Sequence, residues 1–153
     1  MEKVILDFIS KNKIATVCCL DDQQQPYCFN CFYVYEPTQQ LLLFKSSEHT
    51  FHTHCLNTNS EIAGTILPMS INLPSLKGIQ FTGKICYENF LQQLSPTNYY
   101  HKKNPLALAK AGKVWCIQLL MVKMTDNTKV FGNKLVWEKS LYERCLSTYF
   151  TKD

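Results

Sequence analysis

The chain has 153 residues, of which 46% are apolar and 18% charged, which suits one globular domain over residues 1–153 and excludes a disordered chain. Its formal net charge is +4, and no run of lysines is longer than Lys102-Lys103. No apolar run approaches the roughly 20 residues of a transmembrane helix, and no basic stripe suits nucleic acid. We therefore expect neither a membrane nor a nucleic-acid partner, whereas a phosphorylated small molecule is compatible with the charge.

The first elements along the chain are predicted to be a helix and a strand. Apolar residues recur at helical spacing near the N-terminus, which predicts an amphipathic helix over Glu2–Lys11. Ile14–Leu20 is typical of a strand. The polar segment Asp21–Pro26 ends in proline and indicates a hairpin loop.

The next strand, Tyr27–Tyr35, has an unusual pattern. Side chains alternate between the two faces of a strand. One face would carry Tyr27, Phe29, Cys31, Tyr33 and Tyr35, and the other Cys28, Asn30, Phe32 and Val34. Because both sets are largely apolar, we expect burial on both faces, with a barrel interior on one side. The second layer would be a helix, a partner subunit or a bound ring system.

The rest of the chain predicts a strand-rich fold with short helices. The expected turns and loops are Pro37–Gln40, Pro68–Lys77 and Thr125–Thr128. The expected strands are Leu41–Lys45, Ile62–Leu67, Ile79–Tyr87, Val114–Met124 and Val130–Trp137. The expected helices are Ser46–Asn57, Leu91–Ala111 with breaks near its two prolines, and Glu138–Tyr149. About six strands with interspersed helices favour a small closed β-barrel.

The start of the predicted Ser46 helix is a candidate phosphate site. Free backbone N–H groups and the helix dipole bind phosphate at such a position. Ser46, Ser47 and Thr50 would add hydroxyls, and Lys45 and His49 would add positive charge. The alternative is that the two serines only cap the helix, which is their more common role.

Two further sets of polar residues are weaker candidates. Asn30 would be buried and would need hydrogen-bond partners, either a ligand edge or, as we favour, a neighbouring backbone group. His49, His52 and Cys55 would share roughly one helix face, as zinc ligands do, but no fourth ligand is indicated. We therefore expect no metal site.

The eight cysteines are expected to be reduced thiols in a cytoplasmic protein. The segment Met1–Ser10 is charged and lacks the apolar region of a secretory signal. Several cysteines also lie within apolar strand-like runs, where a thiol behaves as a small hydrophobic group.

Several segments together resemble the pyridoxamine 5′-phosphate oxidase-like, FMN-binding split-barrel superfamily. The chain is similar to a small bacterial branch of it, over residues 1 to about 140. The segments that carry the resemblance are Cys28–Tyr33, Ala63–Thr65, Gly78–Gly83, Tyr100 with Pro105, Val114-Trp115, and Thr125–Thr128 followed by Phe131-Gly132, Lys134 and Trp137. The last group is the most specific.

The resemblance implies a six-stranded antiparallel split barrel that forms a homodimer, with FMN bound at the subunit interface. It implies that the strand matching Cys28–Tyr33 lies along the flavin ring. It also implies that residues near Lys134–Trp137 close the site, often from the other subunit. The residues that it places at the cofactor are Asn30, Cys31, Phe32, Phe44, Lys45, Ser46, Ser47, His49, Thr50, Gln80, Lys134 and Trp137.

One position departs from the family pattern. Phe51 stands where the family usually has an arginine or lysine that holds the phosphate. The loss of one charge-assisted hydrogen bond, about 1.5–3 kcal/mol, would weaken binding roughly 10- to 100-fold. Lys45 or His49 would have to compensate.

Two hypotheses for function follow. The first is an FMN-dependent oxidoreductase in which the flavin carries the chemistry, with no catalytic side chain assigned. The second is a non-enzymatic split barrel that has weakened or lost FMN and binds heme or another planar ligand. The cluster of His49, His52 and His54 motivates the heme alternative.

Overall fold

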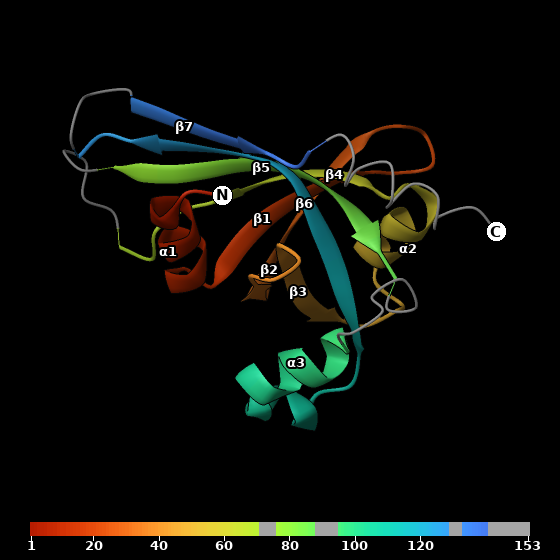
Figure 1. Ribbon diagram of the computed structural model, residues 1–153. Coiled ribbons are helices and arrows are strands. Elements are labelled where there is room, and N and C mark those ends of the chain that lie inside the picture. The colour runs from red at the N-terminus through yellow and green to blue at the C-terminus, as the bar shows by residue number, and fades with distance from the viewer. Residues whose placement is uncertain (71–75, 88–94, 129–132, 141–153) are drawn as a thin grey trace.

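The computed structural model describes residues 1–70, 76–87, 95–128 and 133–140 (Figure 1). The helices within these ranges are α1 (Lys3–Lys11), α2 (Phe51–Thr58), α3 (Pro96–Lys103) and the 3₁₀ helix η3 (Pro105–Ala109). The strands are β1 (Ile14–Leu20), β2 (Pro26–Glu36), β3 (Leu41–Ser46), β4 (Glu61–Ile66), β5 (Lys77–Cys86), β6 (Lys113–Asp126) and β7 (Asn133–Glu138). No helix in this part of the chain is long and apolar enough to cross a membrane.

The strands form one antiparallel sheet that closes on itself. The strand order is β3-β2-β1-β4-β5-β6-β7, and β3 also pairs with β6 along its whole length. Six strands therefore close into a barrel. The seventh strand, β7, pairs with the C-terminal half of β6, from Met121 to Asp126. The six-stranded split barrel expected from the sequence is confirmed.

Alternation of side chains explains the barrel interior. On β1, Ala15, Val17 and Cys19 are buried at 1% exposure or less, while the residues between them face outward. The helix α1 covers one end of the barrel and buries Ile5 and Ile9 completely, as its helical periodicity predicted.

Close packing inside the barrel explains why residue 64 is a glycine. A Cβ atom at Gly64 would overlap the ring of Phe81 on the neighbouring strand β5 and would lie 2.6 Å from the carbonyl oxygen of Thr16. Only glycine lets the large Phe81 ring lie across β4 at this point.

Two predicted helices differ from the structure. The helix after β3 begins at Phe51 rather than Ser46, because Ser46 is still paired with Lys113 of β6. The stretch predicted as a broken helix becomes α3 and η3, with Pro96 at the start of α3 and the Ser95 hydroxyl accepting from the Asn98 amide. Residues 88–94 lie outside the described ranges.

The C-terminal prediction is only partly testable. Glu138 ends strand β7 and does not begin a helix, and the remainder of the predicted helix, from residue 141 onward, lies outside the described residues. The predicted turn at Thr125–Thr128 is supported by Asp126, whose carboxylate accepts from the backbone N–H of Thr128 at 2.9 Å. The pairing of β6 with β7 makes this connection an antiparallel one, as predicted.

Within the single chain, β2 is buried on both faces only at its C-terminal end, so the predicted second layer over the rest of the strand would have to be a partner subunit or a bound ligand. Only Tyr33–Glu36 are fully buried, where β2 pairs with β3. Between Pro26 and Phe32 no residue is buried, and the Phe32 side chain is 68% exposed. Side chains of α2 contact Tyr27 and Phe29 on one face of this half of β2, while Phe32 on the other face remains open to solvent.

Candidate functional site

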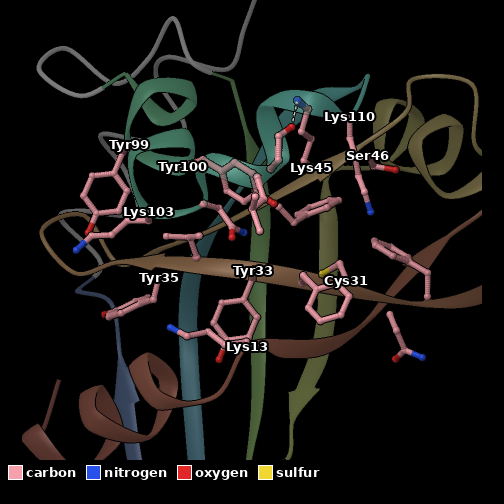
Figure 2. Close-up of a pocket in the computed structure, with 18 of the residues that line it drawn as sticks. Lys13, Cys31, Tyr33, Tyr35, Lys45, Ser46, Tyr99, Tyr100, Lys103 and Lys110 are labelled. Atoms are coloured by element: carbon pink, nitrogen blue, oxygen red, sulfur yellow. Dashed lines mark hydrogen bonds between the residues drawn. The ribbon is translucent and has the colours of Figure 1, made fainter.

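A groove of about 1050 Å³ runs along β2 (Figure 2). Its floor is formed by β2 residues from Phe29 to Tyr35. One wall comes from α3 and η3, which pack near β2 although they lie far from it in the sequence. The end of β3, from Phe44 to Ser47, forms part of the other wall. The groove is thus built from segments that lie far apart in the sequence.

Four lysines line this groove and give it a positive charge. They are Lys13, Lys45, Lys103 and Lys110, and Figure 2 shows them at several places around the groove. No aspartate or glutamate is found among the described residues that line it. Unbalanced positive charge in a hollow attracts anionic groups, since the surrounding protein screens charge less than bulk water does.

Lys45 is the most firmly held of these lysines. Its ammonium donates to the carbonyl oxygen of Ala107 in η3 at 2.9 Å and lies 3.3 Å from Nε2 of His101 in α3. These contacts tie the end of β3 to the wall formed by α3 and η3. An ammonium has three N–H donors, so Lys45 can still donate a hydrogen bond to an anionic ligand in the groove.

A cluster of hydroxyls surrounds His52 at one end of the groove. The ring nitrogen Nε2 lies 2.7 Å from Ser46 Oγ and 3.1 Å from Thr50 Oγ1. The ring also stacks on Phe29, with centroids 4.1 Å apart and planes 13° apart. Burial lowers the pKa of His52, so the neutral ring is favoured at neutral pH. His52 therefore orients hydroxyls and contributes little positive charge.

The structure brings together seven of the residues that the resemblance placed at the cofactor. Those lining the groove are Asn30, Cys31, Phe32, Phe44, Lys45, Ser46 and Ser47. His49 and Thr50 lie beside them in the turn before α2, where the backbone N–H groups of both are directed to Ser47. The favoured partner of the Asn30 side chain was a neighbouring backbone group. In the structure, its Oδ1 instead accepts a hydrogen bond from the Thr16 hydroxyl at 2.7 Å.

Three of the expected cofactor residues lie outside the groove of this chain. Gln80 faces outward from β5, in a row of cross-strand neighbours that runs from Asn30 through Thr16 and Thr65. Three strand spacings, about 14 Å, separate Gln80 from Asn30 on this outer face. Lys134 and Trp137 lie on β7. Lys134 is exposed there, and Trp137 packs against the barrel core.

The three clustered histidines do not converge on one point. His49 precedes α2, His52 faces the groove, and His54 forms an exposed ion pair with Asp22 at 2.8 Å. Cys55, a residue of α2, is fully buried. Within the described residues, no group of three or more histidine, cysteine or acidic side chains is placed to hold a metal ion.

Phe51, at the position where a cation was expected, has a structural contact instead. Its ring meets Tyr27 edge-on, with centroids 4.9 Å apart, and its side chain is 52% exposed. The predicted phosphate position therefore has hydroxyls but neither a lysine nor an arginine in the first turn of α2.

Several groove residues were missed by reasoning from the sequence. They are Lys13, Lys103 and Lys110 among the cations, and Tyr99 and Tyr100 among the aromatic residues. The only local signal was the short Lys102-Lys103 pair beside Tyr99-Tyr100, which gives no indication that α3 packs against β2.

Comparison with known sequences identifies close relatives. The chain is 31% identical to a UPF0306 protein of Yersinia enterocolitica over 136 residues, which cover 89% of this chain and 92% of that protein. It is 30% identical to a UPF0306 protein of Yersinia pestis over 132 residues, covering 86% and 89%. No protein-family model matches the chain.

Solved structures share the fold at low sequence identity. A heme-binding protein of Mycobacterium smegmatis matches with a TM-score of 0.67 at 11% identity, over 86% of this chain and 55% of that one, so this chain spans little more than half of it. A FAD-binding protein of Mesorhizobium loti matches with a TM-score of 0.62 at 12% identity, over 81% and 94%. The heme storage protein HutZ of Vibrio cholerae matches with a TM-score of 0.55 at 14% identity, over 90% and 94%. These likenesses show the fold alone.

Proposed function

The chain belongs to the UPF0306 family. From the geometry of its groove we propose that it binds a planar, anionic ligand of the heme or flavin class. The single observation that carries the proposal is the groove along β2, which has four lysines, no described acidic residue and an aromatic floor. Solved proteins of the same fold that bind heme or FAD support a planar ligand.

The size and chemistry of the groove fit such a ligand. Its volume of about 1050 Å³ lies at the upper end of the range of small-molecule sites. Phe29, Phe32 and Tyr33 offer apolar and aromatic surface to a ring system. The lysine ammonium groups would pair with carboxylates or a phosphate at the edge of that ring.

The geometry favours a binding protein over an FMN-dependent oxidoreductase. The resemblance-based phosphate site retains the hydroxyls of Ser46, Ser47 and Thr50, but Phe51 supplies no cation there. A heme needs its two carboxylates paired, a face covered and a ligand for its iron, and the groove offers lysines for the first. An iron ligand would come from His52, which lines the groove, once its Nε2 leaves the two hydroxyls. When bound, a heme or a flavin would itself supply any redox chemistry.

A second copy of the chain is part of this proposal. The outer face of β2, β1, β4 and β5 carries the row Asn30, Thr16, Thr65 and Gln80, none of which is charged. Next to that row, Phe32 and Leu67 are 68% and 56% exposed. Covering such a surface with a second copy would bury apolar area near the groove. Light scattering should give twice the chain mass of 17.7 kDa, and a monomer at all concentrations would contradict this part.

Titration of the purified protein with hemin and, separately, with FMN tests the proposed function. We expect hemin to bind at micromolar concentrations with a defined Soret band, and FMN to bind more weakly, as read from quenching of its fluorescence. Failure of both ligands to bind at micromolar concentrations would refute the proposal. Tight FMN binding without hemin binding would return the flavin-dependent oxidoreductase as the better hypothesis.

Two matched variants locate the site. Lys45→Gln should weaken ligand binding by about tenfold, since a charge-assisted hydrogen bond is worth about 1.5–3 kcal/mol and other lysines remain. Lys84→Gln is the control, because Lys84 lies on β5 away from the groove and pairs with Glu61 at 3.2 Å. Equal effects from the two substitutions would mean that the groove is not the binding site.

A further inference from the structure

Two cysteines face each other across neighbouring strands behind one wall of the groove. Cys86 of β5 and Cys116 of β6 are direct cross-strand partners. The Ile85 N–H donates to Ser60 on the β4 side at 2.8 Å, so the backbone of Cys86 is directed to β6. Such a hydrogen-bonded pair has its Cα atoms about 5.5 Å apart, which is the usual separation in a disulfide.

The surroundings of Cys86 favour a reactive thiol. Its Sγ lies 3.7 Å from the carbonyl oxygen of Cys116, and the two thiols are also within hydrogen-bonding reach of each other. The hydrogen bond with Cys116 lowers the pKa of Cys86, helped by the positive charge of Lys139 and backbone hydrogen bonds, while burial acts in the opposite direction. A lower pKa increases the fraction of thiolate, the form that attacks disulfides.

We propose that Cys86 and Cys116 form a redox-active dithiol that a low-molecular-weight disulfide, such as oxidised glutathione, converts into an intramolecular disulfide. The Cys86 thiolate attacks one sulfur of oxidised glutathione, forms a mixed disulfide and expels one glutathione thiolate. Cys116, once deprotonated, then attacks the Cys86 sulfur and expels the second glutathione. Two protein thiols are oxidised, one external disulfide is reduced to two thiols, and the released thiolates take up the two protons.

Other paired cysteines of the described chain differ in environment. Cys18 and Cys28 are also cross-strand partners, but burial, together with Cys28 itself, raises the pKa of Cys18. Cys19 lies against Cys55, both are at most 1% exposed, and burial raises the pKa of Cys19 to about 12. Cys86 combines a lowered pKa with partial exposure, which is the combination expected of a thiol that reacts.

The position of the dithiol connects it to the groove. Cys116 belongs to a small apolar cluster that includes Val34 and Tyr100, and Cys86 packs against that cluster. Val34 and Tyr100 also line the groove. A disulfide at this point would fix β6, which α3 contacts, to β5. The dithiol chemistry itself does not depend on the proposed ligand, so the two proposals fail independently.

The test uses the whole chain, equilibrated in glutathione buffers of increasing oxidised fraction, then alkylated and digested with trypsin. Lysines separate Cys86 from Cys116 in the sequence, whereas none lies between Cys18 and Cys28. A Cys86–Cys116 disulfide therefore joins two tryptic peptides, and a Cys18–Cys28 disulfide stays within one. We expect the joined peptides to appear first, with the loss of two hydrogens, and to disappear on reduction.

Variants and a rate measurement complete the test. The cross-link should be lost in Cys86→Ser and in Cys116→Ser and be retained in Cys18→Ser, the matched control. In the unmodified protein, Cys86 should react with iodoacetamide at least several-fold faster than Cys18. The proposal is overturned if Cys86 and Cys116 remain alkylatable in fully oxidised glutathione, or if the Cys18–Cys28 disulfide forms while they stay reduced. Both readings come from the native chain, so misfolding of a variant would not obscure the result.

Discussion

The interior of the barrel and the groove outside it share strand β2, but the interior is packed with apolar side chains and the groove is lined with polar and charged ones. Inside, residues such as Ile79 and Phe81 are at most 2% exposed and belong to one apolar cluster. In the groove, polar groups form hydrogen bonds. Lys45 donates to the carbonyl oxygen of Ala107, and the ring of His52 pairs with the Ser46 hydroxyl. Stability therefore resides in the interior, while the groove is ordered by polar contacts that leave its charge uncompensated.

This contrast predicts that substitutions in the interior lower stability, whereas substitutions in the groove change ligand binding. A buried apolar side chain in a close-packed interior loses many contacts when it is truncated, and the cavity remains. A half-exposed groove residue is partly solvated in either state, so its removal alters binding more than folding. Substitutions that separate stability from binding test this division directly.

Phe81→Ala should have the largest effect on stability. Phe81 is 2% exposed and lies across Gly64 inside the barrel, so the truncation leaves a cavity. The free energy of unfolding should fall by about 3–5 kcal/mol. Phe32→Ala, at a groove residue that is 68% exposed, should change it by no more than about 0.5 kcal/mol. Urea unfolding measures both, and equal losses would mean that the two regions do not differ as described.

Asp126→Asn should have a smaller effect that depends on pH. Burial acts to raise the pKa of Asp126, but hydrogen bonds from Thr128 and the ammonium of Lys77, 3.0 Å away, outweigh it and lower the pKa to about 2. Because the folded pKa is depressed, the contribution to stability is complete above the unfolded value near 4 and is lost as the pH falls toward 2. It amounts to about 2 kcal/mol at neutral pH.

Urea unfolding of the parent and of Asp126→Asn at pH 7, 4 and 2.5 checks this expectation. The difference between them should shrink as the pH falls. Asp22→Asn is the control, since Asp22 pairs with His54 at the surface, where both side chains are more than half exposed. A pH-independent loss in Asp126→Asn would mean that the carboxylate charge contributes nothing and that only its packing matters.

Local patterns account for most of the fold that was predicted. The alternation in segments such as Ile14–Leu20 reproduces strand β1 to the residue, because side-chain period depends only on the strand itself. The start of α2 was misplaced because the pairing of Ser46 with Lys113 joins residues far apart in sequence. No local signal reports such a long-range partner.

The site was predictable only where it follows the strands. Asn30, Lys45 and Ser46 were placed at the cofactor by the resemblance, the last two also by the predicted junction of strand and helix, and all three line the groove. Lys103 and Lys110 were missed because their roles depend on how α3 and η3 fold back onto β2. The apolar residues on both faces of β2 predicted a second layer, but their pattern alone does not say whether a helix, a partner subunit or a bound ring system supplies it.

The smallest predicted effect concerns Phe51, on the groove side of the comparison. Phe51→Arg would restore a cation at the first turn of α2, beside the hydroxyls of Ser47 and Thr50. Because the position is 52% exposed, solvent screens the charge, and the gain should be at most about 1 kcal/mol, or roughly fivefold in FMN affinity. Phe51→Leu, which loses the edge-on contact with Tyr27 without adding charge, is the matched control. FMN fluorescence titration of the three proteins measures the difference. If Phe51→Arg and Phe51→Leu bind FMN equally, the phosphate does not lie at this helix start, and the lysines along α3 and η3 become the anion site.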